Sequence, residues 1–123
     1  MDEKSASSAG AIRPAEPLDL GSLVEYQDGS VVSRTIAKKN GGTVTLFAFD
    51  ELEGLSEHAA PFDALVQILE GQAELTIGGS RVIAGTGQTV LMPANVPHAL
   101  FARTRFKMLL VMVREVTELP AGP

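Results

Sequence analysis

Two histidines, His58 and His98, are the side chains of this chain best suited to acid–base chemistry or metal binding near neutral pH. His98 ends a stretch, residues 87–98, in which a glycine opens a short apolar run that Pro93 ends. Proline cannot continue a central β-ladder and Asn95 tolerates left-handed backbone, so the stretch predicts a strand, a turn and the start of another strand. The turn would fix the direction in which His98 points.

The second histidine, His58, lies near the end of a predicted loop over residues 50–61, just before an apolar segment. Strands of a small barrel place alternate side chains in the interior, so both imidazoles are expected to meet at one mouth of the barrel. Two interpretations remain open from the spacing. The rings form an incomplete metal site, or each is a hydrogen-bonded pocket histidine without a ligand.

Other residue types favour a binding pocket over a reactive centre. The chain has no cysteine, which excludes disulfides, thiolate metal sites and iron–sulfur clusters. It shows no serine–histidine–acid pattern, and its glycine turns do not form a phosphate-binding or dinucleotide-binding loop. An apolar cavity is expected instead, with core packing as the alternative for most of its residues. The predicted ligand-pocket residues are Phe49, Phe62, Gln67, Met92, Phe101 and Met108.

Length and charge limit the class of protein. A chain of 123 residues makes one domain, and a net charge of −5 argues against binding nucleic acid or an anionic membrane surface. The N-terminus lacks the apolar core of a secretory signal, and the longest wholly apolar run, residues 108–113, is too short to cross a bilayer. The expected location is the cytoplasm.

Short β-prone runs separated by turn residues predict an all-β barrel or sandwich with very little helix. Gly78 and Gly79 predict a two-residue hairpin turn. A weak helical turn is expected over residues 18–24. The cations Arg103, Arg105 and Lys107 alternate and predict a solvated face or an edge strand, with an anion-binding stripe as the alternative. The predicted strands cover residues 31–37, 43–49, 64–69, 73–77, 80–84, 89–92, 98–102 and 106–113.

These patterns divide the chain into three parts. Residues 1–17 are rich in Ser, Ala, Pro and charge and predict a flexible or loosely ordered arm. Residues 18–116 form the single β-barrel domain, and residues 117–123 form a tail.

The chain resembles the cupin family of double-stranded β-helix, or jelly-roll, proteins. The second motif of that family is a glycine, five residues, a proline, one residue, a glycine, two residues, a histidine, three residues and an asparagine. Gly87, Pro93 and His98 match the first glycine, the proline and the histidine. Asn95 stands at the second glycine, a mild change since Asn also adopts positive φ. Ala102 replaces the asparagine.

The first cupin motif is degraded. It usually has two histidines one residue apart, then a glutamate and a closing glycine; Gly71 matches the glycine and His58 the first histidine. Ala60 and Ala64 stand at the second histidine and the glutamate. The resemblance implies a divalent metal (Zn, Ni, Fe or Mn), but two imidazoles without a carboxylate neither offset its charge nor fill its coordination shell. Asp63 is expected to face away by strand alternation.

Three functions follow from the resemblance. The first is a small cupin barrel that binds a small molecule, and with it a divalent metal, at the barrel mouth. The alternatives are a metal-dependent enzyme of the oxygenase or isomerase type and an accessory dimer with a vestigial pocket. A homodimer is expected in each case, because the run over residues 106–113 is apolar on both faces of its strand.

Overall fold

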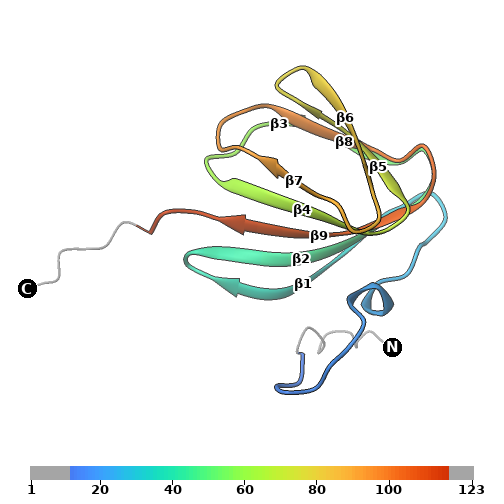
Figure 1. Cartoon of the computed structure of the whole chain (residues 1–123), viewed down its shortest axis with the longest axis vertical. Coiled ribbons are helices and arrows are strands. Elements are labelled where there is room, and N and C mark those ends of the chain that lie inside the picture. Colours follow the sequence, from blue (N-terminus) through green and yellow to red (C-terminus); the bar gives the residue numbers. More distant parts are fainter. Residues whose placement is uncertain (1–11, 117–123) are drawn as a thin grey trace, which may run out of the picture.

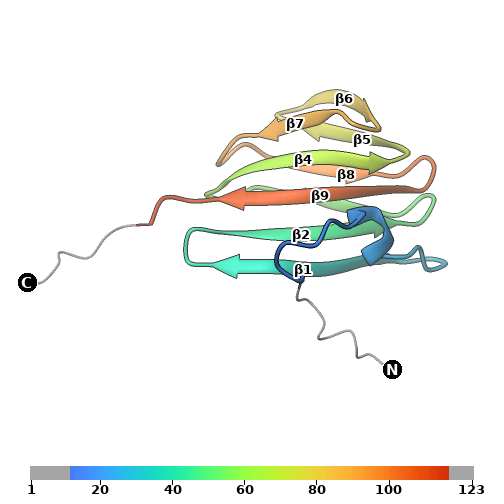
Figure 2. The same cartoon turned by 60° about the horizontal axis from the view of Figure 1, so that its bottom comes forward.

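Two antiparallel sheets stacked face to face make up the protein, in a computed structural model that describes residues 12–116 (Figures 1 and 2). One sheet has the strand order β1-β2-β9-β4-β7 and the other β3-β8-β5-β6. The strands are β1 (Val31–Lys39), β2 (Gly42–Phe49), β3 (Gly54–His58), β4 (Asp63–Glu70), β5 (Gln72–Ile77), β6 (Ser80–Gly85), β7 (Thr89–Met92), β8 (His98–Phe101) and β9 (Phe106–Val113). This is the expected jelly-roll arrangement.

The single helix among the described residues is a 3-10 turn, η1 (Leu20–Leu23), which confirms the weak helical turn expected there. Residues 12–17 are exposed and lie outside helices and strands. The rest of the predicted arm, residues 1–11, and the predicted tail, residues 117–123, lie outside the described residues, and the domain boundaries remain predictions. No helix within residues 12–116 has the length and apolarity needed to cross a membrane.

The core lies between the two sheets and depends on strand alternation. On β4, Ala64, Val66 and Ile68 are buried while the residues between them face outward. The Phe49 and Phe106 rings stack at its centre, with centroids 4.4 Å apart and planes 13° from parallel. Stacked rings of this kind add to the stabilisation that comes from their burial.

One predicted loop contains a strand. Residues 50–61 were expected to be a loop, but β3 pairs with β8 within it. β3 itself carries one apolar residue, Leu55, so its local pattern gives little strand signal. The backbone of β3 pairs with β8. This pairing between distant segments makes β3 a strand, and the local sequence does not specify it.

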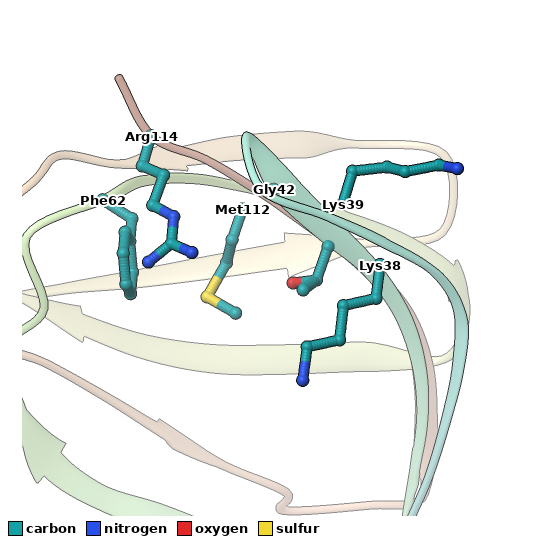
Figure 3. A pocket seen from close by; sticks show the side chains of 7 residues that line it. Lys38, Lys39, Gly42, Phe62, Met112 and Arg114 are labelled. Carbon is teal, nitrogen blue, oxygen red and sulfur yellow. The ribbon is translucent and has the colours of Figure 1, made fainter. Parts of the chain in front are cut away.

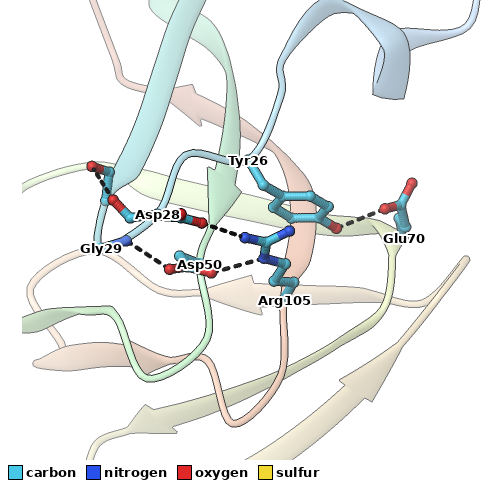
Figure 4. A network of polar contacts seen from close by, with 7 residues as sticks. Tyr26, Asp28, Gly29, Asp50, Glu70 and Arg105 are labelled. Carbon is cyan, nitrogen blue, oxygen red and sulfur yellow. Dashed lines mark hydrogen bonds and ion pairs between the residues drawn. The ribbon is translucent and has the colours of Figure 1, made fainter.

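The cations near residue 105 do not lie on an edge strand, although Arg103 and Arg105 are exposed, as expected for a solvated face. β9 lies in the middle of the five-stranded sheet, and it begins only at Phe106. Arg105 lies just before it, donating from Nε to Asp50 (2.8 Å) and from a terminal nitrogen to Asp28 (3.0 Å). These bonds tie the chain before β1 to the loops at one end of the barrel (Figure 4).

Tyr26 extends this network onto the outer face of the five-stranded sheet. Its hydroxyl donates to Glu70 (2.7 Å), and the Arg105 guanidinium lies 5.1 Å from its ring centroid. Burial, and then the bond to Glu70, raise the pKa of Tyr26 above its ordinary value. Lys107 donates to the Gly21 carbonyl (2.7 Å). The segment that contains η1 packs on the outer side of β1 and β2 (Figure 2). Its apolar residues cover Leu46 and its apolar neighbours there.

Asp50 is expected to make stability depend on pH in the acid range. The Gly29 N–H first, and then the Arg105 guanidinium, lower the pKa of Asp50 from 3.8 to about 2. Because the pKa of the folded state lies below that of the unfolded chain, this stabilisation is present above the unfolded value and is lost as the pH falls through the folded one.

The measurement is the free energy of unfolding of the wild type and of Asp50→Asn at a series of pH values. The wild type is expected to be the more stable at neutral pH, and its advantage should shrink as the pH falls from 3.8 towards 2. An advantage that stays constant across this interval would contradict the assignment.

Candidate functional site

A small, mostly apolar cavity lies between the sheets and has His58 and His98 in its wall. Its volume is about 60 Å³. This is room for about four water-sized groups at roughly 15 Å³ each. The two histidines are the only polar side chains among the residues that line it, which are Leu55, His58, Ala60, Phe62, Ala64, Met92, His98, Leu100, Met108, Leu110 and Met112.

The two imidazoles meet, as the sequence predicts. His58 ends β3 and His98 begins β8, and the two residues are register partners. Their ring centroids are 4.4 Å apart with planes at 69°. His98 is only 7% exposed, while His58 is exposed.

Backbone carbonyls fix the tautomer of both rings. Nδ1 of His58 lies 3.0 Å from the carbonyl oxygen of Ser56, and Nδ1 of His98 lies 3.1 Å from that of Val96. A carbonyl oxygen only accepts, so Nδ1 must carry the proton in each ring. In the neutral form, Nε2 then has a free lone pair and accepts a hydrogen bond or binds a metal.

The turn over residues 93–97 positions His98 as the sequence indicates. Asn95 has φ of 66°, the left-handed conformation expected at this position. Its N–H donates to the Ala60 carbonyl (2.7 Å), and the Asp63 carboxylate accepts from the Ala94 N–H (2.9 Å). Asp63 therefore holds the turn from the outside, and its carboxylate is not a cavity ligand.

The donor set does not fit a resident divalent metal by itself. Within residues 12–116, no group of three or more His, Cys, Asp or Glu side chains is placed to hold an ion. Ala60 and Ala64 line the cavity and supply no donor. Two neutral imidazoles leave both the charge and most of the coordination shell of a divalent ion unsatisfied.

Three of the six predicted ligand-pocket residues line the cavity and three do not. Phe62, Met92 and Met108 line the cavity. Phe49 is fully buried in the core against Phe106 and does not reach the cavity.

Gln67 and Phe101 were predicted to line the pocket, and both predictions were wrong because strand alternation turns these side chains outward. Gln67 is exposed, because on β4 the even-numbered residues face the core. Phe101 is 36% exposed, because His98 and Leu100 occupy the inward positions of β8. The same alternation, counted from His98 and Met108, would have identified the cavity residues Leu100, Leu110 and Met112.

Comparison with known proteins places this architecture in a family. A family model described as a cupin domain matches residues 46–114. A conserved protein of unknown function from Streptococcus pyogenes has a similar structure, with a TM-score of 0.82 and 39% identity over 86% of this chain and 93% of that one. A cupin superfamily protein from Desulfitobacterium hafniense gives a TM-score of 0.80 and 30% identity over 85% of this chain and 95% of that one.

A third structure shows the same barrel within a longer chain. The cupin 2 conserved barrel domain protein from Leptotrichia buccalis has a TM-score of 0.77 and 38% identity, over 79% of this chain and 47% of that one. Among curated proteins, none matches this chain. The family model covers more than half of the chain, and the jelly-roll topology agrees with it, so the chain belongs to the cupin family.

Proposed function

We propose that this cupin binds a small organic molecule in the cavity beside His58 and His98. The observation that carries the proposal is the mostly apolar cavity between the sheets, whose only polar lining side chains are two imidazoles held in one tautomer. Binding sites for small molecules are mostly apolar, with a few placed polar groups that orient the ligand. Since Nε2 of each ring accepts, the ligand would present a hydroxyl or N–H donor to it.

A second candidate uses the same two atoms to hold a divalent cation. Anchoring of Nδ1 by a carbonyl, with Nε2 left for the metal, is the usual arrangement of a histidine ligand. The bound organic molecule would supply the oxygen donors that Ala60 and Ala64 lack. An enzyme of the oxygenase or isomerase type would follow from this candidate.

Thermal unfolding in the presence of small hydroxylated compounds, with and without Zn²⁺, Ni²⁺, Fe²⁺ or Mn²⁺, separates the candidates. A ligand at a hundredfold excess over Kd stabilises the folded state by about 2.7 kcal/mol. Stabilisation by an organic compound alone supports the first proposal, and stabilisation only when a metal is also present supports the second. If neither condition stabilises the protein, the result would support the third function, an accessory protein with a vestigial pocket.

A cavity-filling variant shows whether a compound binds in the cavity. Ala64 is buried in the cavity wall, so Ala64→Leu should abolish the stabilisation. Ala59→Leu adds the same atoms at an exposed neighbouring position and should leave it intact. Stabilisation that survives Ala64→Leu would place the compound elsewhere.

We also propose that the protein is a homodimer that pairs through the outer face of the five-stranded sheet. Val44, Val111, Leu65 and Leu91 are register partners in a row across β2, β9, β4 and β7. Leu65 is 43% and Leu91 53% exposed. A continuous apolar row of this kind is typical of an interaction surface, and a second copy of the chain offers an identical one.

The variant Leu65→Lys with Leu91→Lys is expected to be monomeric, because it would bury four lysines in the interface of a symmetric dimer. Light scattering at micromolar concentration gives the mass. The control is Ile83→Lys, which changes a 47% exposed residue on β6 of the other sheet and should leave the dimer unchanged. A monomeric wild type would refute the dimer.

A further inference from the structure

A second pocket, of about 270 Å³, opens beside the barrel cavity and is lined by three cations. Its walls come from the ends of β1, β2 and β9 and from the segment before β4 (Figure 3). The lining residues are Lys38, Lys39, Gly42, Thr43, Phe62, Met112 and Arg114. Phe62 and Met112 also line the barrel cavity, so the two spaces adjoin at these side chains.

A β-bulge directs Lys38 towards this pocket. The register of β1 against β2 shifts between Thr35 and Ala37, which makes Lys38 the partner of Thr43. Thr43 in turn pairs with Met112, and Met112 with Ala64. Directly paired residues of neighbouring antiparallel strands lie on the same face of a sheet, so Lys38 shares the inner face with the cavity residues Met112 and Ala64. Re-aiming a side chain is a recurrent use of a bulge.

Arg114 stands on the other side of the pocket and is held in place. Its Nε donates to the Asn40 carbonyl (2.8 Å), and its guanidinium carbon lies 5.4 Å from the centroid of the Phe62 ring. In Figure 3 the guanidinium lies beside Phe62 and Met112, while Lys39 extends away from Arg114. Lys38 and Arg114 are therefore the cations best placed to share one anionic group.

The charge of the pocket is not balanced by carboxylates. Within residues 12–116, Lys38, Lys39 and Arg114 form no ion pair, although the whole chain carries a net charge of −5. Cations without a carboxylate partner are the donors that a carboxylate or phosphate group requires.

We propose that this pocket binds the carboxylate or phosphate group of an organic anion whose other end passes Phe62 and Met112 into the barrel cavity. The inference rests on the proposed function, because the far end of the ligand is the part that meets His58 and His98. The ligand class is an anion with an apolar middle and a hydroxyl or N–H donor at the opposite end. The cations fix its orientation in the barrel.

The test is calorimetric titration with ω-hydroxy carboxylates of four, six and eight carbons, the matching ω-hydroxy alkyl phosphates, the neutral diols and inorganic phosphate. At least one ω-hydroxy anion should bind about tenfold or more tightly than the diol of the same length, a difference of about 1.4 kcal/mol. The carboxylate and phosphate series show which anionic group the pocket prefers. Inorganic phosphate should bind more weakly than the phosphate that carries the chain.

The variant Lys38→Gln with Arg114→Gln removes two exposed charges and should weaken binding of the anion about tenfold while leaving the diol unchanged. Arg81→Gln, on β6, removes an exposed charge outside the pocket and should have no effect.

Three outcomes separate the possible failures. Equal binding of anion and diol, unaffected by the double variant, overturns the anion site and leaves the proposed function standing. Inorganic phosphate binding as tightly as the ω-hydroxy alkyl phosphates overturns the continuous ligand. Failure of every compound to bind at millimolar concentration overturns the anion site too, and the thermal-unfolding experiment with metals then decides the proposed function separately.

Discussion

Ala60→His together with Ala64→Glu is expected to turn the cavity into a tight site for divalent metals. Both alanines line the cavity with His58 and His98. They stand where the cupin metal motif has its second histidine and its glutamate. The double variant would complete a three-histidine, one-carboxylate set and supply the negative charge that is missing. Affinity for Zn²⁺ or Ni²⁺ should rise by about 100-fold or more, equivalent to about 2.8 kcal/mol.

Metal analysis after dialysis, on protein without a histidine tag, measures this change. The double variant should retain one metal per chain and the wild type much less. Ala59→His with Leu65→Glu places the same side chains on exposed positions of the same segments and should retain no more metal than the wild type. Stoichiometric metal in the wild type would contradict the conclusion that its donor set is incomplete. No gain in the double variant would contradict the geometry of the cavity wall.

Gly71→Ala is expected to destabilise the fold strongly, although it adds only one methyl group. Gly71, between β4 and β5, has φ of 86°, and a Cβ there would clash with the carbonyl oxygen of Arg105 and press on Phe106. The clash is with backbone in the tight junction that leads into β9, so it cannot be relieved by moving a flexible side chain. The positive φ and the clash together should lower the free energy of unfolding by about 3 kcal/mol or more.

Gly79→Ala separates these two effects. Gly79 has nearly the same φ, 87°, but a Cβ there meets nothing within 4 Å. Its replacement should cost about 1 kcal/mol, from backbone conformation alone. Urea unfolding of both variants gives the comparison. Equal losses would show that the contact with Arg105 and Phe106 has no energetic consequence.

Local chemistry made most of the fold predictable. Gly78 and Gly79 both take positive φ and form the expected hairpin turn between β5 and β6. Asn95 takes the left-handed conformation that its place after Pro93 indicates, and His98 follows it into the barrel. In each case the residues that decide the conformation are a few positions apart.

The remaining features depend on contacts between distant segments. β3 is a strand because β8 pairs with it, and its own sequence gives little sign of that. The bulge in β1 contains no glycine, yet it decides that Lys38 lies on the inner face. Arg105 finds its partners Asp28 and Asp50 at separations of 77 and 55 residues. The proximity of the two histidines was predictable from strand alternation in a small barrel, while the basic pocket beside them depends on the register of three strands.

The most direct test of binding in the cavity uses the two imidazoles themselves. The chain has only two histidines, so the Hε1 signals of the folded protein report on His58 and His98 without interference from other histidines. During titration with the six-carbon ω-hydroxy carboxylate, both signals are expected to shift together and to saturate. The Lys38→Gln, Arg114→Gln variant should need about ten times more ligand for the same shift. Signals of both histidines that stay unmoved at concentrations where calorimetry shows binding would contradict a ligand beside His58 and His98.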